Sequence, residues 1–505
     1  MNISSWWYSK KEEYWDRLVI TNSEQDHFAT YAGLHRLMEA QASQLEDWGV
    51  KPQMKVVLLF PSVPGFLSIF LAVLKVGAIP CPINPNLTPH ELKQILDVLS
   101  PDLAILDGQL FDNQLLKETL EVQVPCAKLS TWTLLKPNVD FHLTLDPYDV
   151  ELEDVACILC TSGTTGLPKA VMLTHDNLLS NVHALRENKT WQDRETFGNA
   201  LPTFHIYGLT VLTLVPIDMG ATVVYMPPFS PQSCLNTIQH LKISCFGGVP
   251  SMFAMLNKYR KYQEYSLDSC KHWVSGGAPL PDATVSEFAE KYSALIYEGY
   301  GMLEASPGIS WNLNDDNYHR GAVGQPLKGV TIEIRNKQGD VLPQGETGLI
   351  WVQSAGVMKG YYRNPEATLD NIHAGWLATG DMGRIDEDGY LYLMGREKHV
   401  ILVGGHNVYP REVETILLKD QAVADAAVVS RAHGTRGEEI LAVVVPSPGT
   451  QVNVQNLQKL CQDQLSSYKR PKKVFLMDHI IRNDSGKVLQ HQLLERIHAQ
   501  ESISA

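Results

Sequence analysis

The first half of the chain alternates short apolar runs with longer segments in which apolar residues recur every three or four positions. The short runs predict buried strands, and the longer periodic segments predict amphipathic helices. Strands are expected at Val56–Phe60, Ala78–Ile83, Leu103–Leu106, Val155–Leu159, Thr222–Tyr225 and Cys245–Phe246, and helices at Tyr31–Trp48, Pro64–Lys75, Glu91–Leu99, Pro231–Leu241 and Ser251–Tyr259. This alternation predicts an α/β fold with helices covering mostly parallel sheets.

The pattern changes near Gly321 to short strands separated by turn signals. Strands at Val330–Ile334 and Gly348–Val352, with turns at Lys337–Asp340 and Asp386–Gly389, predict a small β-barrel or antiparallel subdomain. A further set of elements follows: strands at Ala426–Val429 and Leu441–Val445, and helices at Pro410–Leu418 and Val454–Leu465.

We therefore predict two domains. Residues 1–397 would form a large domain of two helix-covered βα sheets plus the small barrel, and residues 398–505 a smaller, mobile α+β domain. From Arg396 onward there are 14 Lys and Arg against 12 Asp and Glu, a net charge of +2, whereas the rest of the chain carries −16. A mildly basic module beside an acidic body suits a lid that closes over anionic ligands.

Composition narrows the class of protein. With 505 residues, 44% hydrophobic and 19% charged, the chain resembles a soluble globular protein with more than one core. Its net charge of −14 argues against nucleic acid as the main partner. No apolar run is long enough for a transmembrane segment, no signal-peptide pattern is present, and eight cysteines lack framework spacing, so a cytoplasmic location is expected. The Cys157-x-x-Cys160 pair lies in an apolar strand and is expected to be packing.

One stretch carries the clearest chemistry, the segment Thr161–Lys169 that follows the strand at Val155–Leu159. Its glycines let backbone N–H groups approach an anion, its hydroxyls donate hydrogen bonds, and Lys169 adds positive charge. It does not match the P-loop pattern, because Pro168 removes a donor and disfavours a helix at this point. We interpret it as a loop that grips polyphosphate, with a Gly/Ser/Thr surface linker as the alternative.

Several further stretches occur in an order and spacing that cover most of the chain. They are Leu201–Gly208, Tyr297–Glu304, Gly375–Asp381, Gly395–Lys398 onward to Gly405 with Tyr409, Pro410 and Glu412, and Asn483–Lys487. Together with the loop they resemble the adenylate-forming superfamily of acyl-CoA synthetases, 4-coumarate ligases, luciferases and peptide-synthetase adenylation domains. The resemblance implies that ATP activates a carboxylic acid as an acyl-adenylate, and that a thiol then displaces AMP.

The resemblance also implies roles for individual residues. Catalytic roles fall to Lys487, which would bridge carboxylate and α-phosphate, to Glu304, and to His205, which would border the acyl pocket and the thiol path. The phosphates would be bound by Thr161, Ser162, Gly163, Thr164, Thr165 and Lys169, and Mg²⁺ would be bound by Glu304 and Thr161. The adenine would lie beside Gly276, Gly277, Ala278, Glu298, Gly299 and Tyr300. The ribose would be bound by Asp381 and Arg396. Lys398 would be the hinge, and Lys359–Arg363 is expected to have a structural role only.

Two departures from the family pattern affect the prediction. Leu303 stands where a Ser or Thr usually donates to the α-phosphate, a loss of a few kcal/mol in the transition state, so the site is either slower or compensated by Tyr300 and Lys487. Gln490 and His491 weaken a CoA phosphate site near the terminal motif, while the basic run Lys469–Lys473 offers another for CoA or an acidic carrier protein.

The acid substrate is expected to be a fatty or aryl acid. His205 stands where amino-acid-activating relatives have an aspartate, and the neighbourhood of Tyr207, Met302 and Ile309 is apolar. Three functions remain open: an acyl-CoA synthetase using ATP, Mg²⁺ and CoA, an acyl–acyl-carrier-protein ligase using the phosphopantetheine of a carrier protein, and a non-catalytic nucleotide-binding homologue. Only Leu303 supports the last of these.

Overall fold

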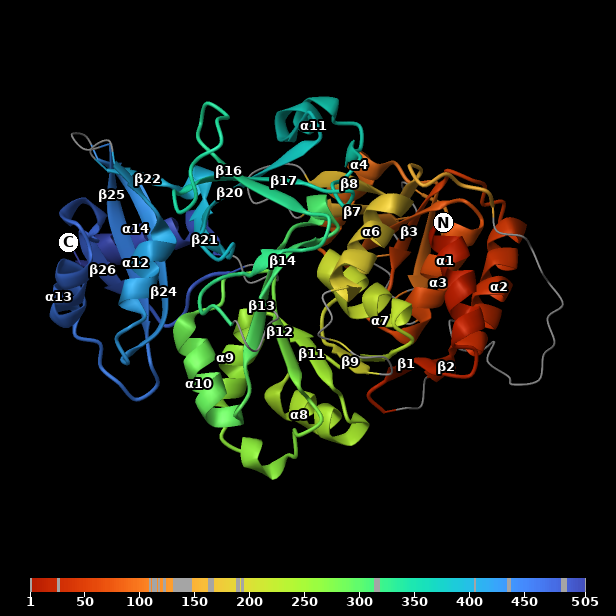
Figure 1. Ribbon diagram of the computed structural model, residues 1–505, viewed down its shortest axis with the longest axis horizontal. Coiled ribbons are helices and arrows are strands. Elements are labelled where there is room, and N and C mark those ends of the chain that lie inside the picture. Colours follow the sequence, from red (N-terminus) through yellow and green to blue (C-terminus); the bar gives the residue numbers. More distant parts are fainter. Residues whose placement is uncertain are drawn as a thin grey trace.

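The computed structural model describes residues 2–24, 28–108, 110, 116, 119–120, 124–129, 148–161, 168–187, 191, 195–312, 318–403, 406–433, 437–482 and 488–504. Figure 1 shows the N-terminal region at one end of the molecule, the C-terminal module at the other, and two further sheets between them. The predicted α/β class with a large N-terminal part and a smaller C-terminal part is confirmed.

The largest sheet has nine strands, in the order β15-β14-β13-β12-β11-β9-β10-β1-β2. Its centre is parallel and its two edges are antiparallel. Its strands are β1 (Leu18–Asn22), β2 (Phe28–Thr30), β9 (Thr196–Asn199), β10 (Thr222–Tyr225), β11 (Cys245–Gly248), β12 (His272–Ser275), β13 (Ile296–Gly301), β14 (Gly308–Trp311) and β15 (Gln325–Pro326). Helices α8 (Pro231–Leu241), α9 (Pro250–Lys258) and α10 (Asp282–Tyr292) bury Leu235, Phe253 and Phe288 in one apolar cluster with β11 and β12.

A second, fully parallel sheet has the order β4-β3-β5-β6, with β3 (Lys55–Leu59), β4 (Ile79–Ile83), β5 (Leu103–Asp107) and β6 (Cys126–Leu129). Helix α4 (Pro89–Leu99) begins with a Thr88–Glu91 capping box and packs its apolar side against this sheet. Beside it lies a small antiparallel sheet of β7 (Val155–Thr161), β8 (Lys169–Thr174) and β18 (Gly360–Tyr361). Ile158 and Ala170 of this small sheet share a core with Val57 and Cys81.

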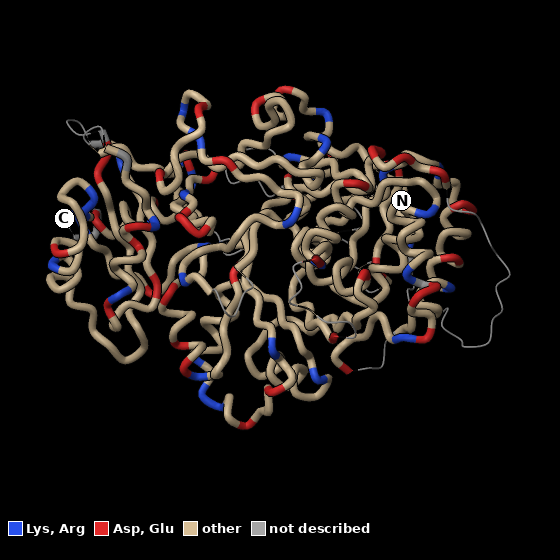
Figure 2. Tube along the Cα trace, in the orientation of Figure 1, with Lys and Arg blue, Asp and Glu red and all other residues tan. Residues whose placement is uncertain are grey.

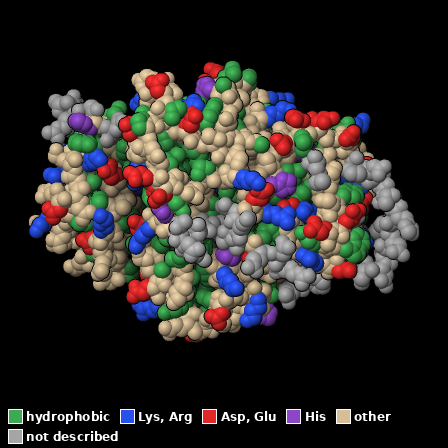
Figure 3. All heavy atoms as spheres, in the orientation of Figure 1, with side chains coloured by type: hydrophobic (Ala, Val, Ile, Leu, Met, Phe, Trp, Pro, Cys, Tyr) green, Lys and Arg blue, Asp and Glu red, His purple; other side chains and the backbone are tan. Residues whose placement is uncertain are grey.

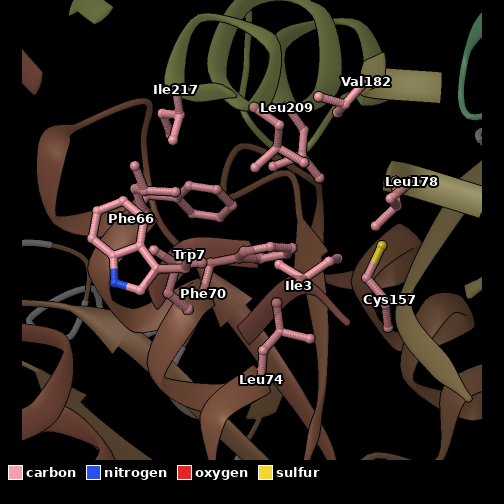
Figure 4. Close-up of a cluster of buried hydrophobic side chains, with 14 of the residues drawn as sticks. Ile3, Trp7, Phe66, Phe70, Leu74, Cys157, Leu178, Val182, Leu209 and Ile217 are labelled. Carbon is pink, nitrogen blue, oxygen red and sulfur yellow. The ribbon is translucent and has the colours of Figure 1, made fainter. Parts of the chain in front are cut away.

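The main core joins elements from distant parts of the sequence. Figure 4 shows side chains of α1 (Ile3–Glu13), α3 (Pro64–Lys75), α6 (His175–Arg186), the π-helix η1 (Tyr207–Leu214) and α7 (Val215–Asp218) converging on one apolar cluster, with α2 (Tyr31–Asp47) also part of it. The sequence did not predict α1 or η1. Every residue of η1 is buried, so it lacks the polar face that would reveal its period.

The predicted small β subdomain is a five-stranded antiparallel sheet, in which the long strand β20 pairs with β17, β19 and β21. Its strands are β16 (Thr331–Arg335), β17 (Gly348–Gln353), β19 (Ile372–His373), β20 (Trp376–Ile385) and β21 (Leu391–Arg396), and α11 (Pro365–Asn371) precedes β19.

The C-terminal module has its own five-stranded sheet between two layers of helices. Its elements are β22 (Ile401–Val403), β23 (His406–Val408), β24 (Val423–His433), β25 (Gly437–Pro446), β26 (Lys473–Leu476), α12 (Pro410–Leu417), α13 (Val454–Gln464) and α14 (Gln490–Ser504). Helices α12 and α13 pack on one face of the sheet and α14 on the other. The chain passes from β21 to β22 through the 3-10 turn η4 (Glu397–His399), which contains Lys398. The domain boundary at residue 398 stays a prediction.

Charges of both signs are mixed on the described part of the face shown in Figure 3. Figure 2 shows Lys and Arg interspersed with Asp and Glu at both ends of the trace. All eight cysteines are free, and burial raises the pKa of both Cys157 and Cys160 to about 12, in keeping with a packing role. Over the described residues, none of the helices combines the length and apolar character that a membrane crossing requires.

A buried carboxylate, Asp218 at the end of α7, attaches the N-terminal helix to the rest of the core. It is 1% exposed, accepts a 2.7 Å hydrogen bond from Trp6 Nε1, and forms ion pairs with Lys10 at 3.3 Å and Arg186 at 2.8 Å. Burial alone would raise the pKa of Asp218, but the Trp6 N–H and the two cations hold it below the ordinary value. The carboxylate is therefore ionised at neutral pH.

Replacing Asp218 by Asn is expected to lower the free energy of unfolding by about 3 kcal/mol at pH 7, because two cations lose their buried partner. Since the folded-state pKa is depressed, the difference from wild type should shrink as the pH falls below about 4. Urea unfolding followed by tryptophan fluorescence measures it. The exposed Asp149→Asn variant is the control, and equal stability of the two variants would contradict the role given to Asp218.

Candidate active site

The two segments expected to frame the adenine leave adjacent parallel strands. Ser275 of β12 pairs with Glu298 of β13, so the Gly276–Ala278 turn and the Glu298–Tyr300 strand end lie side by side. This is the carboxyl end of parallel strands, where ligands bind in open α/β sheets. Glu298 connects the two segments because its Oε1 accepts a 3.1 Å hydrogen bond from the Leu280 N–H.

Glu298 is only 4% exposed, and burial raises the pKa of its carboxyl to about 7. The guanidinium of Arg411 and the Leu280 N–H oppose this shift. Arg411 belongs to α12, so the positive charge that opposes the shift comes from the C-terminal module.

Two of the predicted glycines have a physical reason to be glycine. A Cβ on Gly276 would lie 3.1 Å from Cε1 of Tyr207, whose ring packs against this position from the π-helix η1. Gly277 has φ +82°, a left-handed conformation that side chains rarely adopt. Tyr207 is buried, with its hydroxyl 3.4 Å from the carbonyl oxygen of Val274.

The two residues expected at the ribose lie opposite each other on β20 and β21. Arg396 Nε is 2.8 Å from Oδ1 of Asp381, and the Tyr300 hydroxyl donates to Oδ2 at 2.7 Å. The Asp381 backbone N–H donates to Thr379 Oγ1 at 3.1 Å, which fixes the strand locally. The Tyr300 hydroxyl donates to Asp381 in this structure, and its compensation for Leu303 stays a prediction.

Glu304 lies on η3 (Leu303–Ala305), directly after the nucleotide segment. The Tyr361 hydroxyl donates to Glu304 Oε1 at 3.0 Å, and Lys169 Nζ lies 4.7 Å from the centre of the Tyr361 ring. Within Lys359–Arg363, for which the sequence predicted a structural role only, Tyr361 contacts the predicted site residues Glu304 and Lys169. The stretch Lys359–Arg363 resembles the family pattern in sequence. The residues that Tyr361 contacts are distant along the chain, so the sequence alone did not reveal these contacts.

The turn after Glu304 is clamped from α6 by Asn181. Asn181 Nδ2 donates to the carbonyl oxygens of Ala305 at 3.3 Å and Gly308 at 2.9 Å, and Oδ1 accepts from the Gly308 N–H at 3.1 Å. Asn181 is 2% exposed. Leu303 is partly buried against the main core, so this departure from the family pattern serves packing.

His205 lies at the start of the π-helix and is exposed, as a residue bordering a pocket would be. Its Nδ1 accepts a 3.3 Å hydrogen bond from the Tyr207 N–H, which fixes the ring. The predicted pocket residue Ile309, in contrast, is completely buried in the core beneath the antiparallel sheet.

Cations gather between the two halves of the site. Partial burial and the positive charges of Arg396 and Lys169 lower the pKa of Lys398, while Asp381 opposes this shift. Burial, with Lys398 and Arg396 nearby, lowers the pKa of His399 to about 4, so this imidazole is neutral at physiological pH. The predicted hinge residue thus lies close to the end of the phosphate loop.

Some predicted site residues lie outside the described part of the chain. They are Ser162, Gly163, Thr164, Thr165 and Lys487. Thr161 ends β7 in register with Lys169 of β8, which places the two ends of the loop together. Among the described residues there is no cluster of three or more metal-binding side chains. A single carboxylate such as Glu304 suits Mg²⁺, which is usually held by one or two carboxylates together with substrate phosphates.

The basic run Lys469–Lys473 is largely occupied by contacts within its own module. Lys469 pairs with Glu412 at 2.6 Å, Lys473 pairs with Glu501 at 2.6 Å, and Arg470 donates to the carbonyl oxygen of Leu465. The run is therefore a weaker candidate for CoA phosphates or a carrier protein than the sequence suggested.

Comparison with known proteins identifies the family. The AMP-binding enzyme family matches residues 8–362, and the AMP-binding enzyme C-terminal domain matches residues 412–487. The chain is 31% identical to the long-chain-fatty-acid–CoA ligase of Bacillus subtilis over 490 residues, covering 90% of this chain and 87% of the relative. It is 32% identical to the feruloyl-CoA synthase of an Amycolatopsis species over 479 residues, covering 92% and 94%.

Solved structures agree with this assignment. ATP-bound MatB from Rhodopseudomonas palustris superposes with a TM-score of 0.89 at 28% identity, covering 99% of both chains. The o-succinylbenzoate-CoA synthetase of Bacillus subtilis, in complex with its acyl-adenylate intermediate, superposes with a TM-score of 0.84 at 28% identity, covering 97% of both chains. The chain belongs to the AMP-binding enzyme family, within the acyl-CoA synthetase-like part of the adenylate-forming superfamily.

Proposed function

We propose that this protein is an ATP-dependent ligase that joins a fatty or aryl carboxylic acid to CoA through an acyl-adenylate. The observation that carries the proposal is the pairing of two clusters, Asp381 with Tyr300 and Arg396, and Glu304 with Tyr361 and Lys169. The two clusters are joined along the chain, since Tyr300 lies in β13 and Glu304 in the turn η3 that follows it. One cluster offers a carboxylate for ribose hydroxyls, and the other offers a carboxylate and a cation for polyphosphate.

In the first step, a carboxylate oxygen of the acid attacks the α-phosphorus of ATP, and the bond to pyrophosphate breaks. Asp381 would hold the ribose, and Lys169 would stabilise the departing pyrophosphate. Mg²⁺, when bound at Glu304 and Thr161, would neutralise phosphate charge. Lys487 would hold the acid carboxylate against the α-phosphate. In the second step, the CoA sulfur attacks the acyl carbon and AMP leaves with the bonding electron pair.

The acid is proposed to be apolar. His205, exposed at the start of η1, replaces the aspartate that would pair with an α-amine, and Tyr207 offers an aromatic wall against Gly276. Two relatives, named for long-chain fatty acids and for ferulate, support this class of substrate. A carrier protein remains the alternative acceptor. CoA is favoured as the acceptor, because the relatives with the long-chain-fatty-acid and feruloyl names are CoA ligases.

Supplying ATP, Mg²⁺, CoA and a panel of fatty and aryl acids should yield AMP, pyrophosphate and an acyl-CoA thioester.

Replacing Glu304 by Gln keeps the shape of the side chain but removes its charge, and should slow pyrophosphate release on the order of a hundredfold. The exposed Glu346→Gln variant should retain the wild-type rate. AMP release that ignores CoA, with faster acylation of a holo carrier protein, would favour the alternative acceptor.

Replacing Lys487 by Ala should abolish adenylate formation yet spare thioester formation from a supplied acyl-adenylate, because the second step needs no charge bridge to the α-phosphate. Single-turnover assays of each half-reaction measure the two effects separately. Lys459→Ala, which changes an exposed lysine on α13 of the same module, is the control. Equal loss of both half-reactions would contradict the role assigned to Lys487.

A further inference from the structure

The segment Met358–Tyr362 runs between the end of the phosphate loop and Glu304. On one side it pairs with β8, since the Lys359 N–H donates to the Met172 carbonyl at 3.0 Å and the Tyr362 N–H donates to the Ala170 carbonyl at 2.7 Å. On the other side the Met358 N–H donates to the Glu304 carbonyl at 2.9 Å. The segment therefore fixes the spacing between the strand that carries Lys169 and the turn that carries Glu304.

Tyr361 makes three separate contacts, through its backbone N–H, its hydroxyl and its ring. Its backbone N–H donates to Thr368 Oγ1 at 2.9 Å, its hydroxyl donates to Glu304 Oε1 at 3.0 Å, and its ring face lies beneath Lys169 Nζ. Tyr361 is only 5% exposed, so packing limits its rotamers. The aromatic ring attracts the cation through its quadrupole, while the phenol fixes one oxygen of the carboxylate.

Building on the proposed function, we infer that Tyr361 is a positioning residue that holds the Glu304 carboxylate for Mg²⁺ and holds Lys169 toward the phosphates. The Tyr361 hydroxyl donates a hydrogen bond to Oε1 of Glu304 and so fixes the orientation of the carboxylate. The other carboxylate oxygen, Oε2, would then be available to bind Mg²⁺. Without this hydrogen bond the Glu304 side chain would populate several rotamers. Mg²⁺ would then bind more weakly, because part of the binding free energy would be used to fix the side chain in one rotamer. The ring acts on a different partner, Lys169, so the two effects are separable by substitution.

The adjacent Tyr362 provides a matched control. Its ring lies beneath Lys55 at 5.7 Å and near Arg363 at 5.3 Å, and it packs against the core of the β3–β6 sheet. Tyr361→Phe and Tyr362→Phe make the same chemical change one residue apart, but only Tyr361→Phe removes the hydrogen bond to Glu304.

The test is ATP binding without any acid substrate, measured by isothermal titration calorimetry at increasing Mg²⁺ concentration. The Mg²⁺ concentration that gives half-maximal enhancement of ATP binding should rise about tenfold in Tyr361→Phe, as for loss of a group that orients a metal ligand. Tyr362→Phe should match wild type. Thermal unfolding should remain cooperative in both variants because both retain the ring, and the lost hydrogen bond should lower the midpoint of Tyr361→Phe by only a few degrees.

A second variant tests the ring. Tyr361→Leu should weaken Mg²⁺-free ATP binding by a further factor of about three, the effect of losing a cation–π contact, and should add nothing in a Lys169→Met background. An additional loss of ATP binding in that background would overturn the link between the ring and Lys169.

The inference is overturned if Tyr361→Phe responds to Mg²⁺ as wild type does, or if Tyr362→Phe shifts as far. Either result would leave the proposed function intact. Absence of Mg²⁺-dependent ATP binding in the wild-type protein would instead overturn the nucleotide site itself, and the role of Tyr361 with it.

Discussion

The docking of residues 358–362 between β8 and the Glu304 turn is the contact on which the geometry of the site depends. The site is built from segments that belong to separate sheets: β8 beside the parallel β3–β6 sheet, β13 in the nine-stranded sheet, and β20 and β21 in the antiparallel sheet. Neighbouring sheets share apolar cores, since Val56 of β3, Val171 of β8 and Val223 of β10 belong to one cluster, and Tyr300 of β13 and Ile350 of β17 belong to another. The hydrogen bonds from Tyr361 to Glu304 and from Tyr300 to Asp381 add directional constraints at the junctions between the sheets.

Electrostatics within the site differ from those of the whole chain. The protein is acidic, yet burial together with the positive charges of Arg396 and Lys169 lowers the pKa of Lys398. Like charges held together are unfavourable until an anion binds between them. Because Tyr300 donates its hydroxyl to Asp381, we expect these cations to provide most of the stabilisation of phosphate charge.

Much of the fold followed from the sequence because the strands and helices of the α/β part have clear periods. The predicted helix Pro64–Lys75 and the predicted strand Thr222–Tyr225 coincide with α3 and β10. The π-helix η1 was missed because it is apolar on every side. The contact of Tyr361 with Glu304 was missed because it joins residues 57 positions apart, and no local pattern encodes it. Likewise, the motif around Glu298 could be found in the sequence, but not the direction of its carboxylate toward Leu280.

The central claim is that the chain forms an acyl-adenylate before any thiol is involved. Exchange of radiolabelled pyrophosphate into ATP, measured without CoA, tests this step alone, because exchange requires reversible formation of the adenylate. We expect exchange that appears only when a fatty or aryl acid is added and that requires Mg²⁺. Exchange that is independent of any acid, or no exchange with any acid while ATP still binds, would contradict adenylate formation by this protein.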